Sequence, residues 1–197
     1  MFALVESGSI TSFPKGNRGI QIGDTKYPAT IYTLWSESER NAIGIYTVEI
    51  DNTNKKDEEW YINTDISYAF GSGKVTGTYG TATAKAIADA NAKDSDGNEL
   101  DPVVVIEGLK TIKKRIIDNQ CAGLLAPSDY MAIKAAEGIA IDSGWKTWRA
   151  SVRTKCNSMQ TQIDNAANVD ALTALFTYTE QEDKSVTRPL GEFPIKE

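Results

Sequence analysis

The chain has 197 residues, of which 41% are hydrophobic and 24% charged, and its formal net charge is −6. This composition is typical of a globular protein that forms one large domain or two small ones. The negative charge argues against binding to nucleic acid, which requires a basic surface, and the complete lack of histidine excludes Ser–His and Cys–His nucleophile pairs.

The N-terminal region, residues 1–83, predicts a β-rich domain of short antiparallel strands and hairpins. Short apolar or alternating stretches indicate its strands, at residues 2–5, 10–13, 19–22, 31–35, 45–50, 60–62, 66–70 and 74–79. The first stretch lacks the basic flank of a signal peptide, so we expect a strand there. Ser36 and Glu39 form a capping-box pattern that predicts one brief helix, which Gly44 ends.

Residues 84–107 predict a linker or loose hairpin between two domains. Turn-forming residues cluster at 94–98, and residues 102–106 are the expected return strand. The turn superficially resembles a calcium-binding loop, but its glycine is the fourth residue and Val105 stands where the closing glutamate belongs. We therefore prefer a plain turn to a calcium site, and expect neither a metal ion nor a cofactor.

Residues 108–176 predict a small helical bundle, and residues 177–197 an extended C-terminal tail that could dock on the chain's own body or on a neighbour. In the first helix, Leu109, Ile112, Ile116 and Leu124 mark the apolar face, and Lys110, Lys113 and Lys114 the opposite face. Ser128 is a natural N-cap for the second helix.

The longest predicted helix covers residues 142–167. Its apolar residues recur at steps of three or four and are Trp145, Trp148, Val152, Cys156, Met159, Ile163 and Ala166. The opposite face, which we expect to meet water or a charged partner, carries Lys146, Arg149, Arg153, Gln160 and Asp164. We expect Trp145 and Trp148 to lie in the core.

Few residues suggest chemistry. Cys121 and Cys156 fall on helix faces and are expected to be buried free thiols, with a disulfide left open if the two helices pack together. The carboxylates of residues 51–59 lie in a polar loop where nothing indicates a pocket. Trp35 and Trp60 could be core residues, or could contact a partner or stack on a sugar ring.

No apolar run approaches the ~20 residues of a membrane span, so no membrane insertion is expected.

The second half carries an ordered series of short motifs: Gly108-Leu109-Lys110-Thr111, Leu124-Leu125, Ser128-Asp129-Tyr130, Lys134-Ala135-Ala136-Glu137 and Trp145-Lys146-Thr147-Trp148-Arg149 with Arg153. This series resembles the C-terminal module of bacteriophage tail fibre and tail fibre assembly proteins. The first half is similar to the β-rich module that precedes it, with Tyr27-Pro28, Leu34-Trp35-Ser36 and Gly44-Ile45-Tyr46 as landmarks. The chain departs from the family pattern at Tyr130, where tryptophan is usual, at Lys134 for arginine and at Trp148 for tyrosine.

The charged residues of this series fit a structural role. Arg149 and Arg153 lie four residues apart, so both could reach Asp129 or Glu137 on the preceding helix and set the register of the helices. Such pairs explain these residue types without catalysis, and we expect no enzymatic activity.

The resemblance implies a non-enzymatic structural component of a phage tail that works through contacts with other tail proteins. It further implies a homo-oligomer located in the virion and soluble in the host cytoplasm during assembly. A tail fibre assembly chaperone, absent from the finished particle, is the first alternative. A carbohydrate-binding receptor module that uses Trp35 and Trp60 is the second.

Overall fold

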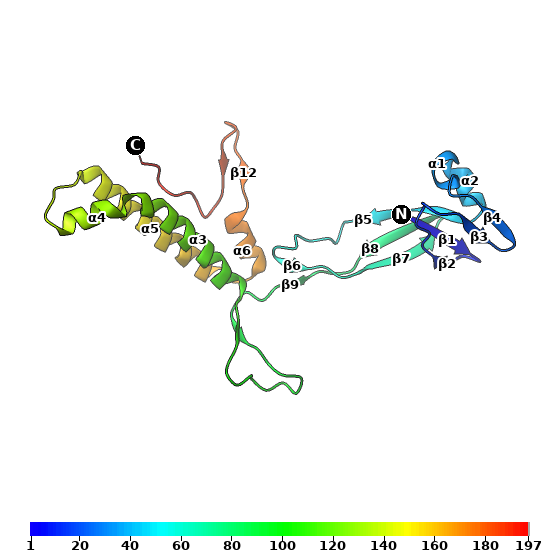
Figure 1. Ribbon diagram of the computed structural model, residues 1–197, viewed down its shortest axis with the longest axis horizontal. Helices are drawn as coiled ribbons and strands as arrows, with labels where there is room; N and C mark the ends of the chain where they lie inside the picture. Colours follow the sequence, from blue (N-terminus) through cyan, green and yellow to red (C-terminus); the bar gives the residue numbers. More distant parts are fainter. Residues whose placement is uncertain (197) are drawn as a thin grey trace. The chain divides into compact units, whose positions relative to one another are not determined.

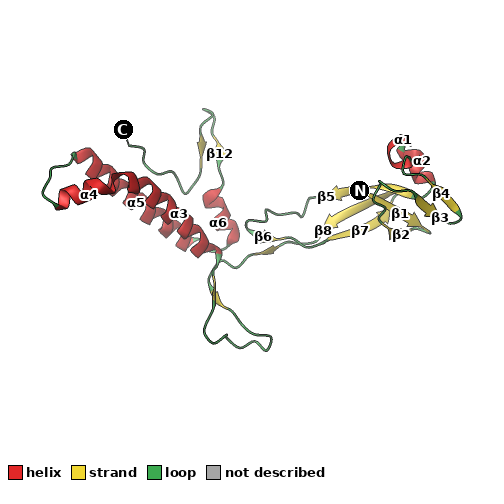
Figure 2. Ribbon diagram, viewed as in Figure 1, coloured by secondary structure: helices red, strands yellow, loops and turns green. Residues whose placement is uncertain are grey.

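The computed structural model describes residues 1–196 and divides into two compact units, Met1–Thr83 and the chain from Ala84 onward. The first unit is rich in strands and the second is mostly helical (Figure 1, Figure 2), so the predicted α+β class is confirmed. The division falls where the sequence places the end of the β-rich domain. No helix among residues 1–196 is long and apolar enough to cross a membrane.

The elements of the N-terminal unit follow one another as β1 (Phe2–Glu6), β2 (Ser9–Ser12), β3 (Ile20–Ile22), β4 (Thr25–Tyr27), α1 (Ile31–Leu34), α2 (Glu37–Ala42), β5 (Ile45–Asp51), β6 (Tyr61–Ile62), β7 (Ile66–Gly71) and β8 (Lys74–Tyr79). β9 (Thr83–Ala84) spans the boundary between the units. Five of these strands form one sheet in the order β2-β1-β5-β8-β7.

One pairing in this sheet departs from the predicted antiparallel arrangement. β1 pairs antiparallel with β2 and β5, and β7 pairs antiparallel with β8. β5 and β8, however, run parallel, with Val48 beside Val75. Hairpin signals report only on strands that follow each other directly, and β5 and β8 are separated by β6 and β7.

The core of the N-terminal unit lies on both faces of the sheet. Successive residues of β1 point to opposite faces, so Ala3 and Val5 join one buried cluster and Leu4 joins the other. The first cluster also contains Val48 and Val75, and the second contains Ile31, Tyr32 and Ile45. The helical turn α1 therefore covers the second face.

The expectation of a strand at residues 31–35 is wrong. Ile31 and Tyr32 are consecutive and both buried, whereas a strand would point them to opposite faces. A single turn of helix places both against the sheet. The following helix α2 begins as predicted, because Ser36 accepts a hydrogen bond from the Glu39 backbone N–H and the Glu39 carboxylate accepts one from the Ser36 N–H.

The C-terminal unit contains β10 (Ala90–Asn91), β11 (Val105–Ile106), α3 (Leu109–Leu125), the 3₁₀ turn η1 (Ala126–Ser128), α4 (Asp129–Ala136), α5 (Ser143–Asn165), α6 (Val169–Phe176), β12 (Thr179–Glu180) and β13 (Val186–Thr187). Asp142 caps α5, since its carboxylate accepts hydrogen bonds from the N–H groups of Gly144 and Trp145. β10 and β11 pair in an antiparallel ribbon that extends away from the helices (Figure 1). We call residues 84–107 the arm.

Helices α3 and α5 pack side by side and supply most of the core of this unit. α5 buries the predicted apolar face, including Val152, Met159 and Ile163. α3 is rotated from the predicted orientation. It buries Leu109, Lys113, Ile117 and Cys121, while Ile116 and Leu124 remain partly exposed. The aliphatic stem of a lysine can line a core if its ammonium finds a partner, and the Lys113 Nζ lies 5.1 Å from the centre of the Phe176 ring.

Candidate functional site

Arg149 on α5 is a buried cation that bonds to three separate elements of the helical unit. Its Nη1 donates a hydrogen bond to the Leu125 carbonyl at 2.8 Å and another to the Ser128 hydroxyl. Its Nη2 donates to the Asp129 carboxylate at 2.6 Å. The guanidinium thus ties α5 to the end of α3, to η1 and to the first residue of α4, and its charge lies at the negative end of the α3 dipole.

Of the two alternatives expected for this face, water or a charged partner, Arg149 takes the second: it pairs with Asp129, as the motif series predicts, and its side chain is only 7% exposed. The sequence pattern missed this burial because one of its partners is a backbone carbonyl. Ser128, which is also buried, donates its hydroxyl hydrogen to the same Leu125 carbonyl at 2.9 Å and makes no side-chain cap for α4.

The other residues predicted to set the helix register take no part in the hydrogen bonds of Arg149. Glu137 is exposed at the end of α4, and neither Glu137 nor Arg153 has an ion pair within residues 1–196. Arg153 instead lines a hollow of about 240 Å³ with Ala132, Ala135, Ile141, Lys146 and Arg149. Tyr130 is 51% exposed, and the Lys134 ammonium lies 5.3 Å from its ring centre. Asp129 is therefore the acid that pairs with Arg149.

Trp145 and Trp148 are half-buried rather than core residues, and the C-terminal tail covers them. Their rings meet edge to face with centroids 5.6 Å apart. The Trp148 indole N–H donates to the Pro194 carbonyl at 2.9 Å, and the Lys196 ammonium lies 4.7 Å from the Trp145 ring centre. The sequence predicts an apolar stripe but cannot show that one end of the stripe meets the tail.

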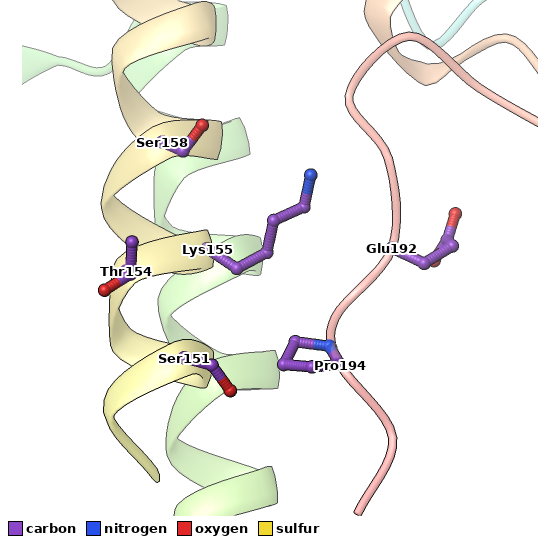
Figure 3. A pocket seen from close by; sticks show the side chains of 6 residues that line it. All are labelled: Ser151, Thr154, Lys155, Ser158, Glu192 and Pro194. Carbon is purple, nitrogen blue, oxygen red and sulfur yellow. The ribbon is translucent and has the colours of Figure 1, made fainter. Parts of the chain in front are cut away.

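The tail is docked on its own unit rather than free. Leu190 is fully buried, its N–H donates to the Leu175 carbonyl at 3.1 Å, and its carbonyl accepts from the Lys155 ammonium at 2.9 Å. Between α5 and the tail lies a hollow of about 540 Å³ lined by Ser151, Thr154, Lys155, Ser158, Glu192 and Pro194 (Figure 3). In Figure 3 the serine and threonine side chains come from α5, whereas Glu192 and Pro194 come from the tail.

The base of the arm is fixed to α3 by a contact that the sequence analysis missed. Asp89 accepts hydrogen bonds from the Gly108 backbone N–H at 2.7 Å and from the Thr111 hydroxyl at 2.9 Å. These bonds, with that from Gly108 the stronger influence, lower the pKa of the Asp89 carboxyl. A side chain at Gly108 would meet the Ala88 backbone at 2.3 Å, so the close approach requires glycine. Because Asp89 is 19 residues from Gly108, no local capping pattern reveals it.

The tip of the arm is a turn held by one carboxylate. Asp94 accepts hydrogen bonds from the backbone N–H groups of Asp96 and Asn98, each at 2.9 Å. The bond from Asn98 is the main cause of the lowered pKa of Asp94. No group of three or more cysteine, aspartate or glutamate side chains is arranged for a metal ion within residues 1–196.

The two tryptophans of the N-terminal unit differ in exposure. Trp60 is only 4% exposed, so of the alternatives left open for it the structure favours the core, because stacking on a sugar needs an open ring face. Trp35 is half-buried and meets Tyr27 edge to face at 5.9 Å. This unit therefore does not present the pair of aromatic platforms that the carbohydrate hypothesis requires.

Cys121 and Cys156 are free and buried between α3 and α5. Burial, and then the neighbouring Cys121 thiol, raise the pKa of Cys156 to about 12. The Cys156 thiol donates to the Asp118 carboxylate at 3.6 Å. A thiol with so high a pKa is a poor nucleophile at neutral pH, because the thiolate is the reactive form.

Comparison of the chain with models of protein families, with curated proteins and with solved structures finds no match. Function has to be inferred from the residues and their geometry.

Proposed function

We propose that the protein is a non-enzymatic structural component of a bacteriophage tail, in a tail fibre, baseplate or tail tip. It would act in the virion as an oligomer, through contacts with other tail proteins. The proposal starts from the resemblance of the motif series between Gly108 and Arg153 to the C-terminal module of tail fibre proteins.

The observation that carries the proposal is that the charged residues of that series, Arg149 and Asp129, bond to each other and so hold the helices together. Arg149 is buried and bonds to Ser128, Asp129 and the end of α3, which fixes the corner between α3 and α4. The tryptophans of the same series contact the protein's own tail, Trp148 through the Pro194 carbonyl and Trp145 through the Lys196 ammonium. Side chains that stabilise the arrangement of the helices are what a structural component of an assembly requires.

The test is protein analysis of purified phage particles that encode this chain. We expect the protein in the particles at a fixed stoichiometry relative to the major tail protein, and we expect it to remain after a high-salt wash. Presence in infected cells together with absence from finished particles would contradict the proposal and favour the assembly chaperone.

A second measurement addresses the role of the buried arginine in assembly. Phage that carry Arg149→Ala should produce fewer particles containing the protein, whereas Arg153→Ala, a matched change at a side chain without an ion pair, should assemble as wild type. Equal incorporation of the two variants would contradict the structural role assigned to the motif.

A further inference from the structure

The arm carries four consecutive apolar residues, Val103 to Ile106, whose exposed fractions lie between 49% and 58%. Because neighbouring side chains of a strand point to opposite faces, both faces of the ribbon are apolar along this strand. An isolated two-stranded ribbon is only marginally stable in water. Exposed apolar strands of this kind are surfaces that another polypeptide covers.

The backbone of this strand is also open along its outer edge. The Val104 carbonyl accepts a hydrogen bond from the Ala92 N–H at 2.7 Å, and Ile106 is paired with Ala90. In an antiparallel ladder these groups alternate in direction, so the N–H and C=O groups of Val103 and Val105 point away from β10. Within residues 1–196, β10 and β11 form a sheet of two strands only.

We propose that this edge binds the same edge of a second copy of the chain, with the two β11 strands antiparallel about a two-fold axis. Val103 and Val105 carry the outward groups in both copies, so they must face one another across the interface. An axis at residue 104 pairs Val103 with Val105, and an axis at residue 105 pairs Val105 with itself in the other copy. An axis at residue 103 is excluded, because Val105 would then need a partner at residue 101, where the chain bends. The result is a four-stranded sheet in which β-branched side chains form cross-strand pairs.

The charge along the arm favours this self-pairing. The tip is acidic, with Asp94, Asp96, Glu99 and Asp101 against a single cation, Lys93. The first turns of α3, at the base of the arm, carry four cations, of which Lys113 is buried, Lys114 pairs with Asp164 and Arg115 pairs with Glu107. An antiparallel arrangement keeps the two acidic tips apart and directs each toward Lys110 and the paired cations of α3 in the other copy, whereas a parallel one would bring the two tips together. The Asp89 contact fixes the arm at its base, so little ordering is needed on binding.

The interface is small. A few apolar side chains from each copy bury less than the ~1,200 Å² of standard protein complexes, so we expect a dissociation constant in the range of about 1–100 μM. Such a dimer forms readily where copies are already concentrated. Self-association through this edge does not depend on membership of a phage tail.

The first experiment is sedimentation of the full chain at concentrations from about 1 to 500 μM, which brackets that range. We expect the wild type to pass from monomer to dimer and Val105→Lys to weaken the dimer at least about tenfold, because a charge on the edge opposes strand pairing. Ile133→Lys makes the same change at an exposed residue of α4 and should behave as wild type. A wild type that stays monomeric throughout, or equal effects of the two variants, would overturn the proposal.

The second experiment locates the axis by cross-linking. Val104→Cys and Val105→Cys proteins are treated with diamide, which takes up the two electrons and two protons released when two thiols form a disulfide. We expect one of the two variants to give a dimer that dithiothreitol reverses, whereas the wild type, whose own cysteines are buried, and Ile133→Cys stay monomeric. Cross-linking of neither arm variant, or of Ile133→Cys to the same extent, would contradict edge pairing.

Discussion

The two units differ in what they bury. The buried core of the N-terminal unit consists of apolar and aromatic side chains such as Ile45 and Val75, whereas the C-terminal unit also buries Lys113, Ser128 and Arg149. The first unit is a sheet with apolar clusters on its two faces. The second combines an apolar helix interface with a buried cation bonded to three separate elements. Apolar burial tolerates many side chains of suitable volume, while the buried cation depends on each of its partners.

The largest effect is expected from a cavity in the sheet. Ile45→Ala removes a fully buried side chain from β5 and should lower the free energy of unfolding of the N-terminal unit by about 3–4 kcal/mol. Urea unfolding followed by amide exchange of β1 and β5 measures this loss. Ile62→Ala, at a residue that is 59% exposed, is the control and should cost less than about 1 kcal/mol.

A slightly smaller loss is expected from Arg149→Ala in the other unit. It leaves the Ser128 hydroxyl without its donor and the end of α3 without its cation, which should cost about 2–3 kcal/mol. Arg149→Lys should recover less than half, because an ammonium cannot bond in the same fork geometry. Urea unfolding with Arg153→Ala as the matched control tests this, and equal losses for Arg149→Ala and Arg153→Ala would refute the contrast between the units.

Loss of one hydrogen bond to the tail should have a moderate effect. Trp148→Phe keeps an aromatic ring but removes the N–H that donates to Pro194, so docking of the tail should weaken by about 1 kcal/mol. Hydrogen exchange and proteolysis of residues 188–196 report on this docking. Trp145→Phe, at a ring that contacts Lys196 through its face, should change them less.

The smallest effect is a dependence on pH at the base of the arm. The pKa of Asp89 is lower in the folded protein than the ordinary value of 3.8, so its carboxylate stabilises the fold above that value. This contribution should disappear as pH falls through the folded-state pKa. We therefore expect the stability difference between wild type and Asp89→Asn to be constant above pH ~5 and to shrink below pH ~4. A difference independent of pH from 2 to 6 would show that Asp89 acts only as a neutral acceptor.

Much of the fold could be predicted because its signals are local. The helix at residues 143–165, the capping box at Ser36 and the hairpin of β7 and β8 follow from residues a few positions apart. At the candidate site the pairing of Arg149 with Asp129 could also be predicted, but the burial of the arginine could not. Periodicity places Arg149 and Lys113 on polar faces, yet both are buried because partners distant in the chain compensate their charge.

Other differences also arise from contacts between distant residues. The parallel pairing of β5 with β8, the Asp89 contact with Gly108 and the cover of Trp148 by the tail join residues 19 to 46 positions apart. A single sequence holds no periodic or local signal for such contacts. The exposed stretch from Val103 to Ile106 lies within the return strand predicted at residues 102–106, of which Val105–Ile106 form β11, but its exposure depends on what surrounds it.

The strand order of the N-terminal unit has a consequence for its synthesis. β8 occupies the position between β5 and β7, so the sheet lacks an inner strand until residues 74–79 have left the ribosome. Until then, the growing chain presents the bare edge of β5 to its surroundings. β7 and β8 can form their hairpin at once and then add to that edge as a unit. We expect this docking step to be slower than hairpin formation, because it closes a longer loop.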